Sequence, residues 1–446
     1  MKLPQPPPDP AGLLNRLADA APGDEILSVF AGKWEVPGRY LHWDNLRHRE
    51  PPKGLTVEEW WLRIRLNRNS GMQPIPLLDL SGTAFGYGVP EFIQRRIHEI
   101  DFGGGGFKSV RGQNPDAGTS ERYLVKSLIS EAITSSQLEG AATTRQVAKE
   151  MLQSGRPPRD RHEQMIANNY RTMQRIVEIH QEPMTPRLVC ELHRLVTEDT
   201  LGNPAKAGRL RVATDQVQVT TTDESVILHD PPPATELKAR MKAMCDFANG
   251  KSPSSFIPPV VCAILLHFWL AYDHPFVDGN GRTARALFYW AMLNRGYWLL
   301  EFISISEIIL KAPSRYARSF LYAESDANDL TYFLDHQTQV IMRAIQELHE
   351  YIGHKKQEAR EAAARLGKLG RYNIRQVALL LHAQKNRRQV YTVHSHKTCH
   401  RVTTQTARTD LEELHRHRLL NRGKHGRAFT YTPAAGLEKK LRAGDH

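Results

Sequence analysis

Residues 274–285 read HPFVDGNGRTAR and hold a histidine, a carboxylate, a glycine-framed amide and two arginines within twelve positions. Gly279 and Gly281 flank Asn280, and glycine permits positive φ angles that turn successive backbone N–H groups inward as an anion-binding nest. The next residues, ARALFYWAMLNRGYW, are rich in helix formers, so the nest is expected at a helix N-terminus, where the helix dipole favours a phosphate. The stretch therefore predicts a helical fold built around a phosphate site.

The charged side chains of the same stretch suit nucleotide chemistry. Arg282 and Arg285 lie three residues apart and share one helix face, where both can bind terminal phosphate oxygens. Asp278 precedes the nest as a hard ligand for Mg²⁺, and His274 is suited to take a proton from an attacking hydroxyl. The alternative is a plain turn between two helices, with a buried histidine and solvated arginines. The complete set of groups, in order, favours phosphoryl chemistry.

At every fixed position the stretch matches H-x-F-x-[D/E]-G-N-G-R-x-x-R, and in this it resembles the Fic family, whose members mainly move AMP from ATP onto a protein hydroxyl. The resemblance implies that His274 is the general base, Phe276 a packing anchor and Asp278 the Mg²⁺ ligand. The remaining implied contacts to the nucleotide are an anion hole of Gly279, Asn280 and Gly281 and two phosphate ligands, Arg282 and Arg285. Asn280 and Arg282 would also stabilise charge that develops on the phosphate. Related Doc kinases carry Lys in place of Gly281, which disfavours γ-phosphoryl transfer.

A second motif, SSQLEG at residues 135–140, fits the family's inhibitory pattern [S/T]-x-x-x-E-[G/N], with Ser135 and Glu139 at the fixed positions. The preceding stretch has helical periodicity, so Glu139 is expected at a helix end with Gly140 as the C-cap. The resemblance implies that Glu139 pairs with Arg285 and denies this arginine to the ATP γ-phosphate. An ordinary surface glutamate is the alternative for the hexamer alone. The position of the hexamer before the catalytic stretch resembles the self-inhibited class of the family, which needs no separate antitoxin.

Between the two motifs, residues 208–233 contain two short β-branched runs that flank Asp223 and Glu224 and predict a hairpin in helical surroundings. Fic proteins place such a flap over the active site, where it holds the target segment by strand addition. The resemblance thus implies that this region binds the protein substrate, and a hairpin without that role is the alternative. We expect His193 and His267 to be packed core residues of the helices around it.

The last 63 residues, 384–446, contain fourteen Lys and Arg against five Asp and Glu, and so hold +9 of the formal net charge of +12. The order of helices and a basic hairpin resembles a winged helix-turn-helix domain, with residues 403–417 in the recognition position and residues 421–432 as the wing. The side chains expected to face bases or phosphates are Thr404, Gln405, Thr406, Arg408, Arg422, Lys424 and Arg427. Docking to a protein or dimerisation is the alternative to DNA binding.

The first hundred residues predict a packed subdomain, because they hold four of the seven tryptophans. Thr56 is expected as a helix N-cap, with Glu59 at the capping-box position. The glycine run at residues 103–106 predicts a hinge into the core.

The length of 446 residues predicts two or three domains. We expect an N-terminal helical subdomain at residues 1–109, a Fic-type core at 110–352, a linker helix at 353–370 and the winged helix-turn-helix domain at 371–446. Four cysteines without paired spacing, and an N-terminus without a hydrophobic signal core, favour a cytoplasmic protein without a membrane partner.

The sequence therefore predicts a mostly α-helical Fic-type core with a small β-hairpin flap, followed by a C-terminal winged helix-turn-helix domain. The implied activity is the Mg²⁺- and ATP-dependent transfer of AMP to a Tyr, Thr or Ser hydroxyl of a protein, inhibited by Glu139. Two alternatives stay open. The first is removal of AMP from a modified protein, with Glu139 positioning a water, and the second is a DNA-binding regulator that senses nucleotide. Homodimerisation also stays open.

Overall fold

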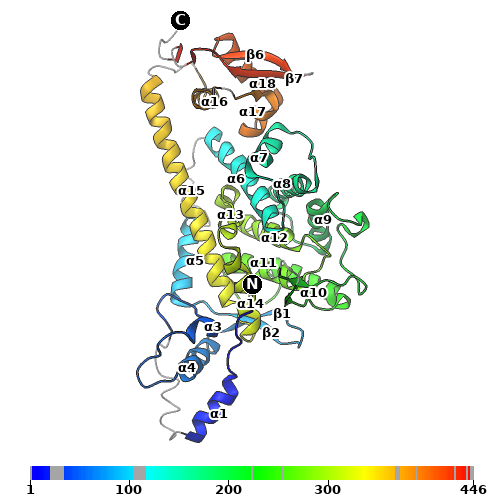
Figure 1. Cartoon of the computed structure of the whole chain (residues 1–446), viewed down its shortest axis with the longest axis vertical. Helices are drawn as coiled ribbons and strands as arrows, with labels where there is room; N and C mark the ends of the chain where they lie inside the picture. Colours follow the sequence, from blue (N-terminus) through cyan, green and yellow to red (C-terminus); the bar gives the residue numbers. More distant parts are fainter. Residues whose placement is uncertain are drawn as a thin grey trace.

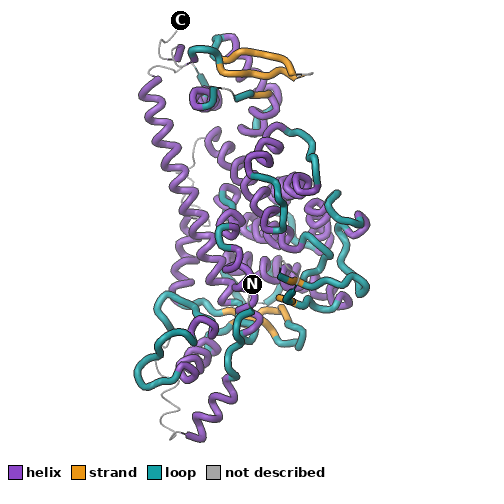
Figure 2. Tube along the Cα trace, viewed as in Figure 1, coloured by secondary structure: helices purple, strands orange, loops and turns teal. Residues whose placement is uncertain are grey.

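The computed structural model describes residues 3–20, 35–103, 117–221, 225–253, 255–366, 372–387, 389–425, 428–437 and 440–441. The described chain is mostly helical, with three small antiparallel sheets (Figures 1 and 2). The prediction of a mostly α-helical fold is therefore confirmed. Residues 104–106 of the predicted hinge, together with Asp223, Glu224 and Arg427, lie outside the described residues.

The N-terminal elements are α1 (Pro10–Ala20), α3 (Trp43–Leu46), α4 (Val57–Asn69), β1 (Gln73–Leu78), β2 (Ala84–Tyr87) and α5 (Glu91–Gly103). The predicted capping box is confirmed at the start of α4: Thr56 Oγ1 accepts from the Glu59 N–H at 3.2 Å, and Glu59 Oε2 accepts from the Thr56 N–H at 2.7 Å. Around α4 lies a small core that contains Trp43, Trp60 and Trp61.

The N-terminal part contains the hairpin of β1 and β2 in addition to its helices, and this hairpin was not predicted. Its turn is made by local polar contacts, because Asp79 Oδ1 accepts from the backbone N–H groups of Ser81 and Thr83 at 2.8 Å each. Gly82 takes φ +83° in this turn, a conformation that glycine adopts without strain.

Ten helices build the central part of the described chain. They are α6 (Ala117–Leu138), α7 (Arg145–Ser154), α8 (Arg161–Ile179), α9 (Pro186–Thr197), α10 (Leu237–Ala248), α11 (Pro259–Asp273), α12 (Asn280–Asn294), α13 (Ile305–Leu310), α14 (Pro313–Ser325) and α15 (Thr331–Leu366). Helix α11 is apolar on nearly all sides and is buried along almost its whole length, as expected for a central helix. Helix α12 packs against α11, and the 274–285 stretch forms the loop between them and the first turns of α12.

Helix α15 continues without a break for 36 residues. It runs along one side of the molecule from the central helices towards the C-terminal elements (Figure 1). Residues 352 and 353, where the sequence analysis separates core from linker, lie inside this helix. The helix-forming composition of residues 354–366 explains the continuity, since these residues extend the preceding helix.

The C-terminal elements are α16 (Ile374–Lys385), β5 (Tyr391–Thr392), α17 (Val393–His400), α18 (Thr404–Arg416), β6 (Leu420–His425) and β7 (Ala428–Pro433). The three strands form one sheet in the order β5-β7-β6. These elements enclose a hydrophobic cluster of their own, which includes Leu380, Leu411 and Leu414. The assignment to the winged helix-turn-helix class stays a prediction. No helix among the described residues combines the length and the apolar character that crossing a membrane requires.

Asp410 ties the C-terminal helices together from inside this unit. Its carboxylate accepts from Asn373 Nδ2 at 2.8 Å, from Arg375 Nε at 2.7 Å and from His396 Nε2 at 3.1 Å. Burial opposes the charge, but these hydrogen bonds outweigh it and hold the pKa of Asp410 well below its ordinary value.

We expect Asp410→Asn to lower the stability of the C-terminal unit by roughly 1–3 kcal/mol at neutral pH, because a buried charged acceptor is lost. The measurement is amide hydrogen exchange of residues 374–433 in urea. Because the folded-state pKa is depressed, this contribution is complete above the ordinary pKa of Asp and is lost as the pH falls through the folded-state pKa. Glu412→Gln on the same helix is the control. Equal protection from hydrogen exchange in Asp410→Asn and Glu412→Gln would contradict the stabilising role of Asp410.

Candidate active site

His274 caps the C-terminal end of α11 in a left-handed backbone conformation, with φ +43°. Such a conformation is uncommon for a residue other than glycine, and here neighbouring groups stabilise it. Arg211 Nε donates to the His274 carbonyl at 2.9 Å, and the Arg211 N–H donates to the Pro275 carbonyl at 2.9 Å. Arg211 was not predicted as a site residue, and it fixes the backbone on which the histidine sits.

Among the described residues, one nitrogen of the His274 imidazole has a hydrogen-bond partner. Nδ1 lies 3.2 Å from the Ala271 carbonyl, which can only accept, so Nδ1 carries the proton and Nε2 keeps its lone pair. Burial lowers the pKa of His274 to about 4, so the ring is neutral at physiological pH. A neutral imidazole with a free Nε2 is suited to accept a proton.

His193 holds the loop that follows. Its ring stacks on Phe276 at 3.7 Å between centroids. Nδ1 accepts from the Gly208 N–H at 2.9 Å, so Nε2–H donates to the Asp278 carbonyl at 2.8 Å. Burial lowers the pKa of His193 to about 4, which keeps this single neutral form. His193 is buried, as expected for a core histidine, but it also positions the site.

The side chain of Asn280 closes the loop on itself. Oδ1 accepts from the Phe276 N–H at 3.0 Å, and Nδ2 donates to the Phe276 carbonyl at 2.8 Å. Both polar groups of this buried amide are used within the loop. Any contact of residue 280 with an anion therefore has to come from its backbone N–H.

Gly279 and Gly281 lie where a side chain has no room. Gly279 takes φ +82° as the N-cap of α12, and a Cβ there would lie 2.6 Å from Thr197 Cγ2. A Cβ on Gly281 would lie 2.2 Å from Glu139 Oε1. The Glu139 carboxylate thus packs directly against the predicted anion nest.

Both arginines of the stretch are buried, with 1% of their surface exposed, so the alternative of solvated arginines is wrong. Arg282 Nη1 donates to the Val196 carbonyl at 3.0 Å. Among the described residues, Arg282 Nε and Nη2 have no hydrogen-bond partner. Nη2 lies 3.6 Å from Asp278 Oδ1, an ion-pair distance. A buried guanidinium with unused donors fits an anionic ligand.

Asp278 is more exposed than the arginines, with 39% of its side chain accessible. Its Oδ2 also lies 3.4 Å from Nη2 of Arg161, which was not predicted as a site residue. In the part of the chain that the structure describes, no three His, Cys, Asp or Glu side chains gather as metal ligands. Mg²⁺ at nucleotide sites is often held by one or two carboxylates together with substrate phosphates, so Asp278 fits as the single protein ligand.

Arg285 meets the end of α6. Its Nη2 lies 2.8 Å from Glu139 Oε1, while Nε donates to Ser135 Oγ at 2.8 Å and Nη2 to the Ser135 carbonyl at 3.0 Å. Helix α6 ends at Leu138, and Gly140 takes φ +89°, as expected for its C-cap. Burial acts to lower the pKa of Arg285, but the Glu139 carboxylate outweighs it and the pKa is raised.

The flap region contains the expected hairpin, formed by β3 (Val219–Thr220) and β4 (Ile227–His229). His229 attaches β4 to the core, because its Nδ1 lies 2.7 Å from Glu324 Oε2 and its Nε2 lies 2.7 Å from the Tyr272 carbonyl. Tyr272 is two residues before His274, so the hairpin adjoins the site.

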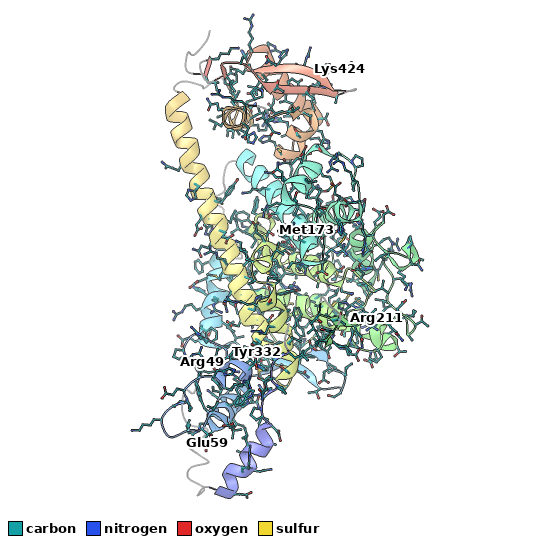
Figure 3. All side chains as sticks on the ribbon, viewed as in Figure 1. Arg49, Glu59, Met173, Arg211, Tyr332 and Lys424 are labelled. Carbon is teal, nitrogen blue, oxygen red and sulfur yellow. The ribbon has the colours of Figure 1, made fainter. Side chains whose placement is uncertain are left out.

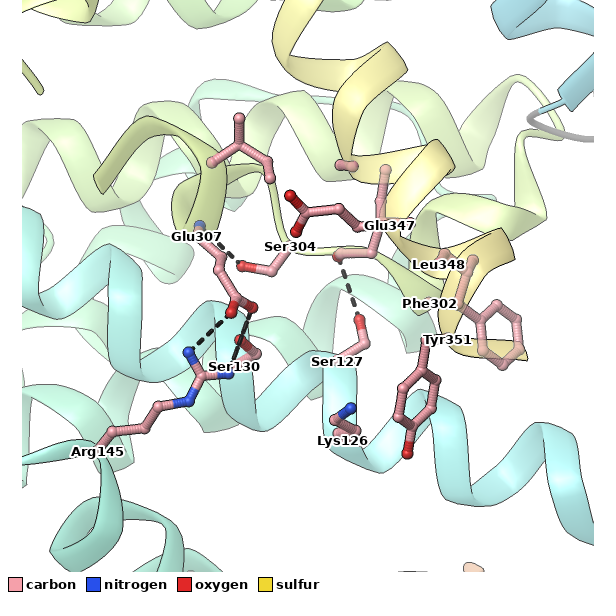
Figure 4. A pocket seen from close by; sticks show the side chains of 13 residues that line it. Lys126, Ser127, Ser130, Arg145, Phe302, Ser304, Glu307, Glu347, Leu348 and Tyr351 are labelled. Carbon is pink, nitrogen blue, oxygen red and sulfur yellow. Dashed lines mark hydrogen bonds and ion pairs between the residues drawn. The ribbon is translucent and has the colours of Figure 1, made fainter. Parts of the chain in front are cut away.

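A cavity of about 230 Å³ lies elsewhere, between α6, α13 and α15 (Figure 4). At its edge Arg145 Nη1 pairs with Glu307 Oε1 at 2.8 Å and Arg145 Nη2 donates to Ser130 Oγ at 3.0 Å. No residue of the 274–285 stretch lines this cavity. It is therefore separate from the predicted site.

Known proteins match the part of the chain that contains these residues. A model of the Fic/DOC family matches residues 183–292. The chain is similar to the protein adenylyltransferase Fic of Nematostella vectensis, with 36% identity over 116 residues, and to the protein adenylyltransferase fic-1 of Caenorhabditis elegans, with 35% identity over 111 residues. These matches cover 26% and 24% of this chain and only 24% and 19% of the two relatives.

Two solved structures are also similar. A Fic family protein from Desulfovibrio desulfuricans matches with 18% identity and a TM-score of 0.46, over 77% of this chain and 95% of that one. Fic-1 of C. elegans matches with 19% identity and a TM-score of 0.45, over 58% and 71%.

The family match spans the complete 274–285 stretch. It also includes His193, which hydrogen-bonds to the Asp278 carbonyl, and the hairpin of β3 and β4. Residues 183–292 of this chain are therefore a Fic domain of the Fic/DOC family.

Proposed function

We propose that this protein transfers AMP from ATP to a hydroxyl group of a protein. The observation that carries the proposal is a neutral His274 next to a glycine nest and to Arg282, where His274 Nε2 and two guanidinium nitrogens of Arg282 have no hydrogen-bond partner within the described part of the chain. The curated relatives are named protein adenylyltransferases, which is consistent with this chemistry.

In the proposed reaction, the hydroxyl oxygen of a Tyr, Thr or Ser bonds to the α-phosphorus of ATP, and pyrophosphate leaves. His274 Nε2 takes the hydroxyl proton. Arg282 and the backbone N–H groups of residues 279–281 stabilise the charge on the phosphate oxygens. Asp278 would hold Mg²⁺, which when bound neutralises phosphate charge.

The contact of Glu139 with Arg285 opposes this reaction. The carboxylate occupies a guanidinium that the γ-phosphate would need, and it packs against Gly281 of the nest. A triphosphate and a carboxylate repel each other and compete for the same donors. We therefore propose that ATP binds productively only when Glu139 has moved away.

For the protein substrate, we propose that residues 208–233 hold the target. His229 keeps the hairpin of this region next to the end of α11 and so beside His274. A strand edge in that place can align an extended segment by main-chain hydrogen bonds.

Replacing Glu139 should activate the enzyme. We expect Glu139→Gly to incorporate label from α-labelled ATP into protein on the order of tenfold or more faster than the wild type, because the competing carboxylate is gone. Glu139→Gln keeps the size of the side chain but not its charge, so its rate of label incorporation should lie between those of the wild type and Glu139→Gly. The His274→Ala form of each variant is the blank. Absence of label from every form, with cell lysate as target, would contradict the proposal and favour AMP removal or nucleotide sensing.

The pH dependence of kcat/KM should follow the titration of His274. Because its base form is the active one and its pKa is about 4, the kcat/KM of Glu139→Gly should stay level from pH 8 to about pH 5 and fall only below that. The measurement is a pH–rate profile, with circular dichroism at each pH as the control for unfolding. A midpoint near the ordinary histidine pKa would show that His274 is not the desolvated base inferred here.

We also propose that the C-terminal unit binds duplex DNA. Helix α18 buries Ala407, Leu411 and Leu414 and leaves Thr404, Gln405 and Arg408 exposed. Lys424 is exposed on the adjacent hairpin (Figure 3). An exposed polar helix beside a basic hairpin, in a segment with a net charge of +9, matches the geometry of major-groove readers.

Arg408→Ala and Lys424→Ala should each weaken the binding of the full chain to duplex DNA and lower the slope of log K against log salt by about 0.9 per lost phosphate contact. Fluorescence anisotropy over a salt series measures both quantities. Lys242→Ala, an exposed lysine on α10, is the matched control. Binding that is undetectable, or that does not depend on salt, would leave a protein partner as the better explanation of this surface.

A further inference from the structure

Helices α6 and α12 meet along a seam of polar contacts spaced one helical turn apart. Arg285 Nε donates to Ser135 Oγ at 2.8 Å. Four residues earlier on α6 and four residues later on α12, Tyr289 Oη donates to Glu131 Oε2 at 2.9 Å. Residues four apart share one face of a helix, so both contacts lie on the faces that the two helices turn to each other.

The same spacing continues to the nucleotide site. Four residues after Ser135, the Glu139 carboxylate packs against Gly281, which is four residues before Arg285. Each step forward along α6 therefore corresponds to an equal step back along α12. The two helices run antiparallel in a fixed register, and Glu139 is the last contact of that register.

Glu131 is the most strongly held member of this seam. It is a buried carboxylate, 2% exposed, and it accepts from three groups besides Tyr289. These are Ser304 Oγ at 2.8 Å, the Ser306 N–H at 3.1 Å and Ser306 Oγ at 2.5 Å. The carboxylate thus ties the middle of α6 to α12 and to the start of α13.

We propose that Glu131 is a positioning residue that sets the register of α6 on α12 and thereby keeps Glu139 on Arg285. This inference rests on the proposed inhibitory role of Glu139. Glu131 lies eight residues before Glu139, about 12 Å along a helix, so it acts through the helix and not through the nucleotide. Release of inhibition then requires α6 to shift, because the seam contacts break together.

Weakening Glu131 should shift the balance towards the released helix while Ser135, Glu139 and Arg285 all remain. Glu131→Gln keeps the size of the side chain, but its amide places a donor among hydroxyl and N–H donors. Loss of about one charge-assisted hydrogen bond corresponds to about a tenfold change in the equilibrium.

The experiment compares the full-length wild type, Glu131→Gln, Glu139→Gly and the double variant in the initial rate of label incorporation from α-labelled ATP. We expect Glu131→Gln to be about tenfold faster than the wild type. The double variant should match Glu139→Gly alone, because Glu131 then has no inhibitor to position. Glu191→Gln, a half-exposed glutamate on α9, is the control for the charge change. Tyr289→Phe, which removes one donor to Glu131, should act in the same direction by a few-fold and covers the case in which Glu131→Gln does not fold.

Two further measurements do not depend on turnover. Affinity for ATP by isothermal titration should rise about tenfold in Glu131→Gln. Amide hydrogen exchange of residues 126–140 should be faster in that variant and unchanged in Glu191→Gln.

Wild-type rates for Glu131→Gln and Tyr289→Phe, with an active Glu139→Gly, would overturn the inference and show that the Glu139 side chain leaves on its own. A double variant slower than Glu139→Gly would overturn it too, because Glu131 would then only support the fold. If Glu139→Gly is itself inactive, the proposed function fails. In that case the ATP affinity and the hydrogen exchange decide on Glu131 alone, and no change in either refutes its positioning role.

Discussion

The site depends on a full positive charge that is buried at the junction of α6 and α12. Arg285 is 1% exposed, and a buried guanidinium is stable only with an anion and good acceptors around it. In this structure Glu139 and Ser135 supply them. Any ligand that takes over Arg285 has to bring comparable negative charge, which a nucleotide phosphate does. The proposed competition between Glu139 and a nucleotide phosphate would thus follow from the burial of Arg285.

Several side-chain contacts also hold the loop between α11 and α12 in place, although the loop leads into the glycine-rich sequence DGNG. The stacking of His193 on Phe276, the double hydrogen bond from Asn280 and the Arg211 contact with the His274 carbonyl leave this loop few alternatives. The rigidity matters because proton transfer and phosphate binding both need the reacting groups within tenths of an ångström. Two of these supports, His193 and Arg211, come from elements far away in the sequence.

The separation of contacting residues along the sequence decides which features of the fold and the site could be predicted. The 274–285 stretch, the position of Glu139 at a helix end and the capping box at Thr56 are local patterns, and local patterns can be read from one sequence. Arg211, Arg161 and Glu131 carry no local signal, because their partners lie 63, 117 and up to 175 residues away. The β1–β2 hairpin does have a local signal, the Asp-x-x-Gly turn at residues 79–82. The boundary expected at residue 352 has no break in secondary structure, since α15 continues through it.

The missing side chain of Gly281 determines which substitutions could release Glu139. The space left by its missing side chain receives the Glu139 carboxylate, and the same backbone is the proposed seat of a phosphate. In the proposed reaction, a larger residue there would displace the Glu139 carboxylate and would also fill the proposed phosphate nest, so we expect it to lower the activity and not to raise it. On this proposal, substitutions that release Glu139 are expected on α6 and at Glu139 itself, and not in the first turn of α12.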